Sequence, residues 1–480
     1  MTAPLRLPRP WTEDVVYMIL IDRFHRGRTS APPPEAPFHG GNLAGVREKL
    51  DYLEDLGVSA LWLSPVYRNQ HDGYHGYWPV DFSAVDPRLG TLEELQDLVQ
   101  ECHRRGIKVL LDMVMNHAGY DHPMAKDPKY RSWFHHSGDI RWMDQRSLER
   151  GSLHGLPDFA QEKEEVARWL IDNALWWQEK TGVDGFRLDA VKHVPAAFWR
   201  RFSKEVHAKG GPDFLLLGEV LRGVPGYIAR YQRDAGIDSV FDVPFADAVR
   251  STLSRDAEDP GPGLTRRLVE LWGEYKTMLY NEILRKLKAR PADMNALAEL
   301  VRAERAYARP ELLAPFIDNH DMSRFVSEAH PHEPRLRLAL ALLLTWRGIP
   351  VLTYGTEAGM AGRTHGDNRA PMRFGADPGL FGLLRRLVGL RRSTPALTGG
   401  SLRQVSSDRE VFAFLREKGE SRVLTALNNS RHVQRRSFTL DEATSRREWV
   451  DALSGERFRQ EGPALEVRLE PRSARILIGP

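Results

Sequence analysis

The sequence has little cysteine, since Cys102 is the only one among 480 residues. A single thiol excludes an intramolecular disulfide and argues against a zinc site built from cysteine ligands. Long apolar runs are also missing, because the longest, LALALLLTW at 338–346, is shorter than the roughly 18 apolar residues that span a bilayer. The basic N-terminal residues precede no apolar stretch, so we expect no signal peptide, no membrane partner and a cytoplasmic protein.

An excess of either charge sign is absent as well. Lys and Arg number 68 against 65 Asp and Glu, a formal net charge of +3. The Arg residues are spread along expected helices and the C-terminal segment, as on a solvated surface. We therefore expect no nucleic-acid partner. The length suits one large domain with one or two smaller ones.

Short apolar runs alternate with amphipathic helical patterns over most of the chain. The helix expected at 91–106 begins with a Thr cap and ends in basic residues and Gly, and a buried strand follows it. Alternation of this kind predicts a parallel sheet, and eight repeats predict a closed (β/α)8 barrel of the α/β class, with a doubly wound open sheet as the alternative. The expected strands lie at 15–22, 58–65, 107–117, 183–190, 213–220, 239–245, 311–320 and 349–355.

Two segments interrupt this alternation. Residues 118–161 are rich in Pro, Gly, His and Trp without a long periodic element, which predicts a small excursion after the third strand. Residues 396–480 hold short β-type runs separated by turns, which predict an antiparallel β-sandwich. The barrel would then comprise 1–117 and 162–395, including a mostly helical stretch at 264–309.

Polar side chains gather at the C-terminal ends of the expected strands, where barrels of this type place their working groups. In GFRLDAVKH (185–193), Arg187 and Asp189 share one face of the strand, and Arg187 should keep Asp189 ionised and suited to nucleophilic attack. An acid at one strand end is more often a cap or a surface ion pair. Several on one rim predict acid/base and nucleophilic work on an acetal. The other strand ends carry Asn116 and His117, Glu219, and His320 and Asp321.

The segments DMVMNH, GFRLDAVKH, GEV and FIDNHD resemble, in this order and spacing, the signature segments of the α-amylase family of retaining glycoside hydrolases. LPDF at 156–159 and GIPVLTYG at 348–355 resemble two further segments of that family. The resemblance runs from about residue 15 to about 395. It implies hydrolysis of α-1,4-glucosidic bonds in starch, maltodextrins or related α-glucans through a covalent glucosyl-enzyme.

The resemblance also implies roles for individual residues. Asp189 would be the nucleophile, Glu219 the general acid/base, and Asp321 the carboxylate that stabilises the oxocarbenium-like transition state. A Tyr of the family segment similar to DGYHGYWPVD (72–81) stacks on the reactive glucose, and Tyr77 matches it; a merely packed loop aromatic is the alternative. The implied substrate contacts are His75, Tyr77, His117, Arg187, Lys192, His193, His320 and Arg369.

Many members of the family bind a structural calcium between barrel and excursion. Asn116, Asp158 and the backbone carbonyl of His193 match the usual ligand positions, and oxygen ligands suit a hard cation. Simple caps and turn residues remain the alternative. The resemblance implies no organic cofactor.

Other features bear on specificity and assembly. HGDNRAPM (365–372) resembles a segment of cyclodextrin- and maltodextrin-acting members, although His365 stands where an Asp is often found. The chain begins almost at its first strand, without the N-terminal module by which many cyclodextrin-hydrolysing members dimerise, and this favours a monomer. A maltogenic amylase or cyclomaltodextrinase and a 4-α-glucanotransferase remain alternatives, as does, less favoured, a non-catalytic binding protein.

Overall fold

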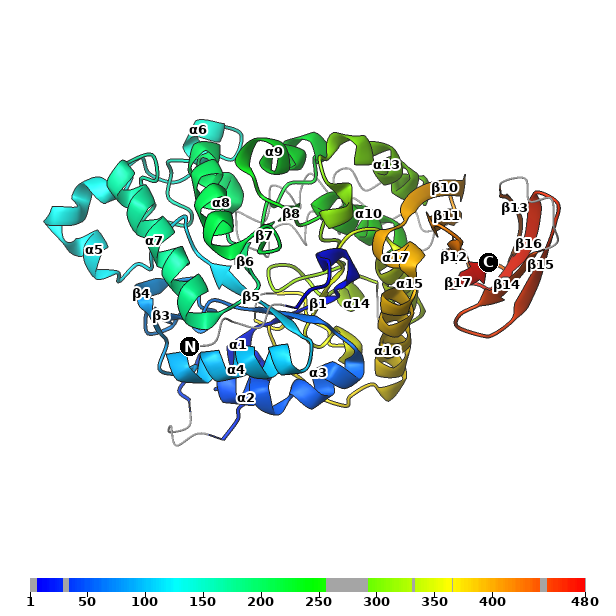
Figure 1. The fold of residues 1–480 in the computed structure, drawn as a ribbon, viewed down its shortest axis with the longest axis horizontal. Coiled ribbons are helices and arrows are strands. Elements are labelled where there is room, and N and C mark those ends of the chain that lie inside the picture. The colour runs from blue at the N-terminus through cyan, green and yellow to red at the C-terminus, as the bar shows by residue number, and fades with distance from the viewer. Residues whose placement is uncertain are drawn as a thin grey trace, which may run out of the picture.

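The computed structural model describes residues 7–28, 34–255, 292–329, 333–364, 366–440 and 447–479. Within these ranges the chain forms a parallel α/β barrel, with an excursion at one side and an antiparallel sheet at the other (Figure 1). The predicted fold class is therefore confirmed.

The barrel sheet has the strand order β8-β7-β6-β5-β2-β1-β9, and every neighbouring pair is parallel. Gly185 at the start of β6 allows the close packing of its neighbours, because a Cβ there would lie 2.4 Å from the backbone oxygen of Leu215. The strands are β1 (Val16–Ile19), β2 (Ala60–Leu63), β5 (Lys108–Met113), β6 (Gly185–Leu188), β7 (Leu215–Gly218), β8 (Ser239–Val240) and β9 (Val351–Thr353).

The barrel closes through a segment that is not a regular strand. Ala314 forms an isolated parallel bridge with Phe241, and the amides of Ile349 and Val351 donate to the carbonyls of Leu313 and Pro315 at 2.7 and 2.9 Å. The prediction of a strand over 311–320 is therefore wrong in form although right in place. Pro315 has no N–H for a strand ladder, which limits regular pairing here.

The strand predicted at 239–245 is also wrong beyond its first two residues. Helix α10 (Val243–Leu253) begins there instead, because the Asp242 side chain accepts a hydrogen bond from the Phe245 amide at 3.2 Å and Pro244 lies in the first turn. The first strand similarly ends earlier than predicted, since α1 (Ile21–Phe24) follows β1.

Helices surround this sheet (Figure 1). The predicted Thr91 cap begins α4, and the structure adds a reciprocal bond between Thr91 and Glu94. The helical stretch predicted at 264–309 lies partly outside the described residues, and its described part contains α13. The remaining helices are α2 (Leu43–Glu48), α3 (Leu50–Leu56), α4 (Leu92–Arg104), α7 (Glu164–Thr181), α8 (Ala196–Gly210), α9 (Pro225–Ala235), α13 (Asn295–Ala303), α14 (Phe325–Glu328), α15 (Glu333–Thr345), α16 (Pro378–Ser393) and α17 (Pro395–Gly399).

The excursion after β5 contains α5 (Pro123–Lys126), the 3-10 helix η2 (Pro128–Trp133) and α6 (Gln145–Leu148). An isolated bridge between His117 and Asp158 fastens it to the barrel end, and a bridge between Phe134 and Phe159 joins two parts of the excursion itself. A two-stranded hairpin, β3 (Tyr67–Asn69) and β4 (Pro79–Val85), lies beside it. The loop of this hairpin carries His75 and Tyr77.

The C-terminal segment forms an eight-stranded antiparallel sheet with the order β10-β11-β12-β17-β14-β15-β16-β13. Alternate residues of β11 separate two cores: Val411 and Ala413 face the sheet's own core, whereas Phe412 and Phe414 pack on Trp346 of the barrel at 6.2 and 5.2 Å between ring centroids. The strands are β10 (Ser401–Ser407), β11 (Val411–Lys418), β12 (Ser421–Asn428), β13 (Gln434–Thr439), β14 (Arg447–Asp451), β15 (Arg457–Glu461), β16 (Ala464–Leu469) and β17 (Ser473–Gly479).

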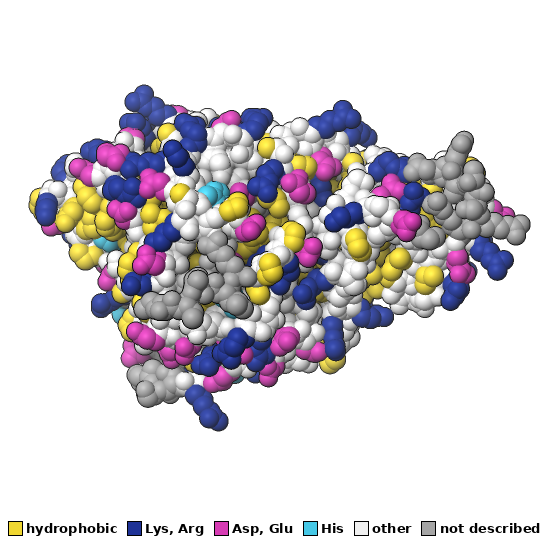
Figure 2. All heavy atoms as spheres, in the orientation of Figure 1, with side chains coloured by type: hydrophobic (Ala, Val, Ile, Leu, Met, Phe, Trp, Pro, Cys, Tyr) yellow, Lys and Arg dark blue, Asp and Glu magenta, His cyan; other side chains and the backbone are white. Residues whose placement is uncertain are grey.

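Charged side chains of both signs are intermixed on the face of the molecule shown in Figure 2, as the balanced composition predicts. Among the described residues, no helix combines the length and apolarity needed to cross a membrane.

Candidate active site

Arg187 lies at the centre of the acidic cluster at the C-terminal ends of the strands. Its Nη1 is 2.7 Å from Asp189 Oδ1 and its Nη2 is 2.8 Å from Glu219 Oε1, while the guanidinium itself is almost fully buried. Asp189 follows β6 and Glu219 follows the adjacent β7, so parallel pairing brings the two acids to the same rim. Their side chains keep 12% and 8% exposure, which leaves them reachable by a substrate.

A third carboxylate in this cluster, Asp112, was missed by the sequence analysis. It pairs in register with Arg187 across β5 and β6, and Arg187 Nη1 lies 2.9 Å from Asp112 Oδ1. The indole of Trp62 and the hydroxyl of Tyr77 both donate to Asp112 Oδ2, at 2.9 and 2.8 Å. The available signal was an acid inside an otherwise apolar strand, which seldom occurs without a buried partner.

Burial acts strongly on these carboxyl groups. Burial raises the pKa of Asp189 well above its ordinary value, Arg187 opposes the rise, and the nearby charges of Glu219 and Asp112 add to it. Burial likewise raises the pKa of Asp112. The sequence analysis considered only the effect of Arg187. Because these carboxyl groups share one guanidinium, their titrations are coupled, and Arg187 is the charge that opposes their protonation.

Backbone hydrogen bonds join the loop that carries Asp189 to the loop that carries Glu219. Ala190 has φ 49° and ψ 36°, a left-handed conformation unusual for a residue with a side chain. In this conformation its N–H donates to Glu219 Oε2 at 3.0 Å. The amide of Val191 donates to the Glu219 carbonyl, also at 3.0 Å. Backbone strain at a site of this kind fixes the orientation of one acid relative to the other.

Asp321 is held by two basic residues. His320 Nε2 lies 3.0 Å from Asp321 Oδ2, and Arg369 Nη2 donates to Asp321 Oδ1 at 2.7 Å. Partial burial alone would raise the pKa of Asp321, but His320 and Arg369 outweigh it and hold the pKa far below its usual range. Arg187 contributes to the same lowering, so Asp321 belongs to the electrostatic environment of the Arg187 cluster.

Tyr77 connects the two halves of the site. Its ring lies parallel to that of His320, with centroids 5.5 Å apart and an interplanar angle of 4°, while its hydroxyl reaches Asp112. The ring of His75, on the same loop, lies 5.8 Å from that of Tyr77 between centroids, and His75 Nδ1 accepts a hydrogen bond from the Tyr77 amide at 3.0 Å. Burial lowers the pKa of His75 to about 3, so its imidazole is neutral.

The remaining predicted contacts lie around this cluster. His117 Nε2 lies 3.0 Å from the Tyr77 carbonyl, and burial lowers its pKa to about 4. Lys192 donates to the Leu221 carbonyl at 3.0 Å, and burial lowers its pKa to about 8. The imidazole of His193 instead contacts the excursion, with Nδ1 3.1 Å from the Leu148 carbonyl. His365 lies outside the described residues.

The three predicted calcium ligands do come together. The Asn116 side-chain amide faces Asp158 Oδ1 at 3.3 Å and the His193 carbonyl oxygen at 3.0 Å. If the amide nitrogen of Asn116 points inward, it donates to both of these oxygens. If the amide oxygen points inward, three oxygens converge, and oxygens are the ligands of a hard cation. His135 Nδ1 is 2.7 Å from Asp158 Oδ2. Burial raises the pKa of Asp158 to about 7. The donor chemistry therefore fits a calcium ion.

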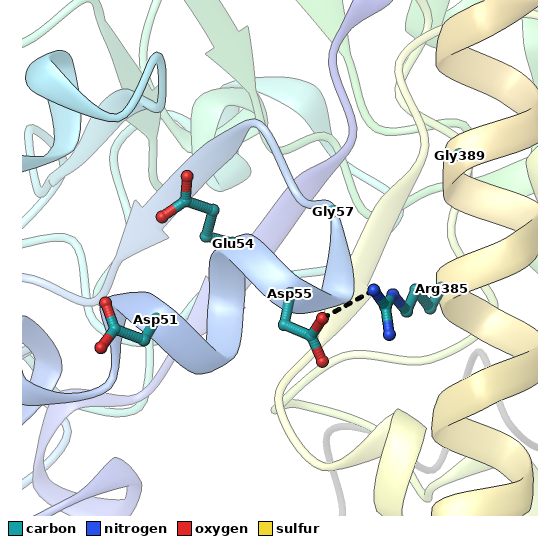
Figure 3. Close-up of a pocket in the computed structure, with 6 residues that line it drawn as sticks. All are labelled: Asp51, Glu54, Asp55, Gly57, Arg385 and Gly389. Atoms are coloured by element: carbon teal, nitrogen blue, oxygen red, sulfur yellow. Dashed lines mark ion pairs between the residues drawn. The ribbon is translucent and has the colours of Figure 1, made fainter.

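A surface pocket of about 590 Å³ lies elsewhere, between α3 and α16 (Figure 3). Its acids are paired: Arg385 lies 3.0 Å from Asp55, and Arg105 contacts Asp51 and Glu54. Because α3 ends at Gly57 just before β2 begins, this pocket lies at the opposite end of the barrel from the acidic cluster.

Comparison with known proteins places this geometry in a family. Residues 18–378 match the family model described as alpha amylase, catalytic domain, and residues 402–476 match the maltogenic amylase C-terminal domain. Neopullulanase 2 of Thermoactinomyces vulgaris is 31% identical over 97% of this chain and 77% of its own length. Beta/alpha-amylase of Paenibacillus polymyxa is 30% identical over 99% of this chain, which spans only 38% of that protein.

Solved structures agree with the sequence matches. The crystal structure of alpha-amylase from Geobacillus thermoleovorans, complexed with acarbose, superimposes with a TM-score of 0.87 at 36% identity, covering 98% of this chain and 99% of that one. A cyclomaltodextrin glucanotransferase, CldA, superimposes with a TM-score of 0.81 at 27% identity, covering 98% and 99%. The chain therefore belongs to the α-amylase family of retaining glycoside hydrolases, as an α-glucan hydrolase or transglycosylase.

Proposed function

We propose that this protein hydrolyses α-1,4-glucosidic bonds in starch, maltodextrins or related α-glucans with net retention. The observation that carries the proposal is the single guanidinium of Arg187 joined to both Asp189 and Glu219. Retaining glycosidases place their two carboxyl groups about 5 Å apart, and two acids that share one guanidinium suit such a spacing.

In the first step a carboxylate oxygen of Asp189 attacks the anomeric carbon, while protonated Glu219 gives its proton to the departing glycosidic oxygen. The glucosyl group is then esterified to Asp189. In the second step Glu219, now ionised, takes a proton from water, and the hydroxide displaces Asp189 from the sugar. Arg187 keeps a positive charge between the two acids throughout and so lowers the cost of the negative charge that moves from one to the other.

We propose that the Asp321, His320 and Arg369 group holds the hydroxyls of the reacting glucose. The support is that Arg369 and His320 keep Asp321 ionised, and an ionised carboxylate stabilises the positive charge of an oxocarbenium-like transition state. Tyr77 offers its ring to the apolar face of the same sugar. Lys192, three residues after Asp189 in the chain, would face the leaving group. We also propose that residues 118–161 form a small separate domain and that residues 396–480 form a distinct C-terminal domain.

A second candidate activity is maltogenic or cyclomaltodextrin-hydrolysing action. The match of residues 402–476 to the maltogenic amylase C-terminal domain favours it. We expect starch to be cleaved to short maltooligosaccharides, with β-cyclodextrin cleaved more slowly. The measurement is a time course of products from both substrates at equal glucose content. Faster cleavage of β-cyclodextrin would favour the second candidate, and no cleavage of either would contradict both.

We also propose that one calcium ion binds to Asn116, Asp158 and the His193 carbonyl, with the Asn116 amide oxygen turned inward. The ion would neutralise the buried carboxylate of Asp158 and tie the excursion to the barrel. The convergence of the three groups supports this.

Chelation with EDTA is expected to lower the melting temperature by about 3 °C at calcium concentrations near one hundred times its dissociation constant, and added calcium should restore it. Differential scanning fluorimetry measures this shift. The Asp158→Asn variant should lose the response, whereas the exposed excursion variant Asp121→Asn should keep it. An unchanged melting temperature after chelation would mean that the Asn116 nitrogen faces Asp158.

A further inference from the structure

One glutamine of the excursion contacts segments that follow both catalytic acids. Gln145 begins α6, and its Oε1 accepts hydrogen bonds from the Tyr227 hydroxyl at 2.7 Å and from Arg230 Nη2 at 2.9 Å. Its Nε2 donates to Glu149 Oε1 at 2.6 Å and to the Lys192 carbonyl at 3.4 Å. Both polar atoms of this side chain are therefore used. Figure 1 shows α6 along the same edge of the molecule as α9, which carries Tyr227.

The two barrel segments that Gln145 contacts begin at the catalytic acids. Lys192 lies three residues after Asp189, and Lys192 Nζ donates to the Leu221 carbonyl, two residues after Glu219, at 3.0 Å. Tyr227 lies further along the segment that starts at Glu219. The segments that follow Asp189 and Glu219, on the proposed leaving-group side, are therefore both in contact with one side chain of the excursion, that of Gln145.

The rings in this region have different surroundings. Tyr227 has the guanidinium carbons of Arg222 and Arg230 within 4.3 and 4.0 Å of its ring centroid, so cations already contact its π surface. Lys192 Nζ lies 5.0 Å from the Trp142 ring centroid, and Trp142 contacts His193 edge-on at 5.9 Å. The ring of Tyr227 therefore already contacts two guanidinium groups, whereas the ring of Trp142 lies beside Lys192.

Exposed apolar side chains lie just before Gln145 and just before α9 (Pro225–Ala235). Met143 next to Trp142 is 72% exposed, and Val224 before α9 is 51% exposed. The indole of Trp142 and the Lys192 side chain beside it, here called the acceptor wall, suit a glucosyl unit, which has apolar C–H faces and hydroxyls at its edge.

Building on the proposed function, we infer that Gln145 is a positioning residue for acceptor sugars: it binds the Lys192 carbonyl, and so keeps Lys192, with Trp142 beside it, where a maltooligosaccharide binds on the leaving-group side. Occupancy of the acceptor wall decides whether the glucosyl-enzyme is captured by a sugar hydroxyl or by water. In transfer, the acceptor hydroxyl gives its proton to Glu219 and its oxygen displaces Asp189, forming a new glycosidic bond. In hydrolysis, water does the same.

Two substrates separate positioning from catalysis in the Gln145→Ala variant. With α-maltosyl fluoride the leaving group is a single fluoride ion, so kcat/KM for fluoride release at low sugar concentration should stay within about twofold of wild type. With maltose added as acceptor, the acceptor KM should rise about fivefold to tenfold. The ratio of transfer to hydrolysis products from maltotriose should fall at least about threefold.

Two further variants sharpen the test. Tyr227→Phe removes only one hydroxyl that donates to Gln145 and should shift the acceptor KM in the same direction by about twofold. Gln96→Ala removes a half-buried glutamine of α4 that donates to the Lys180 carbonyl of α7 at 2.6 Å, and this variant should match wild type. Equal losses on the fluoride and on the acceptor, or an unchanged transfer ratio in Gln145→Ala, would overturn the inference. Failure of the wild type to cleave the fluoride would instead contradict the proposed function.

Discussion

Replacing Asp189 with Asn is expected to lower kcat on starch by at least about 10⁴-fold, because the amide cannot form the ester intermediate. Asn keeps the size of the side chain and one oxygen acceptor for Arg187, so the geometry of the cluster should survive. Initial rates of reducing-sugar release measure the loss, and the substrate KM should change much less than kcat.

Two controls accompany this variant. Asp172→Asn changes an exposed acid on α7 that pairs with Arg168, and it should retain wild-type activity. The melting temperature of Asp189→Asn should stay close to wild type, or rise, because one buried carboxylate is neutralised. A loss of only about tenfold in a folded Asp189→Asn protein would contradict the assignment of the nucleophile.

Replacing Glu219 with Gln is expected to have an effect that depends on the leaving group. On starch, kcat should fall about 10³-fold, because no acid protonates the departing oxygen. On α-maltosyl fluoride the first step needs little acid assistance, so the enzyme should be glycosylated quickly and then hydrolysed slowly. Stopped assays should show one burst of fluoride per active site followed by a slow phase.

The matched control is Glu179→Gln, an exposed acid on α7 whose partner is Lys209. It should show no burst and an unchanged steady rate. Addition of azide to Glu219→Gln should speed the slow phase, since an anionic nucleophile needs no general base. Equal losses on starch and on the fluoride would show that Glu219 acts in some way other than proton transfer.

The barrel follows from local signals that are strong in this sequence. The Thr91 cap and the basic residues and Gly at the far end predicted α4, because each signal acts within one turn of the chain. The prediction of a regular seventh strand at 311–320 was wrong for the opposite reason. The run around Pro315 is apolar enough for a strand, but its hydrogen bonds come from Ile349 and Val351, which lie far along the chain. The run at 239–245 could not be told from the start of a helix by apolarity alone.

The site also divides into residues marked by local signals and residues that depend on contacts between distant segments. Asp189 and Glu219 could be predicted because strand ends are visible in the sequence and barrels place reactive groups there. Asp112 was missed because its importance depends on the register between β5 and β6, which sets it opposite Arg187. The contact of Gln145 in α6 with Tyr227 in α9 joins residues 82 positions apart, and no local pattern marks it. The monomeric state and the cytoplasmic location stay predictions.

The covalent ester on Asp189 is the central claim, and trapping it tests that claim most directly. Glu219→Gln is mixed with α-maltosyl fluoride, quenched in acid during the slow phase, digested and analysed by mass spectrometry. The account predicts one maltosyl group per protein, attached to Asp189 in the peptide that contains GFRLDAVKH. A maltosyl group on another residue, or fluoride release at a fast steady rate with no attached sugar, would contradict it.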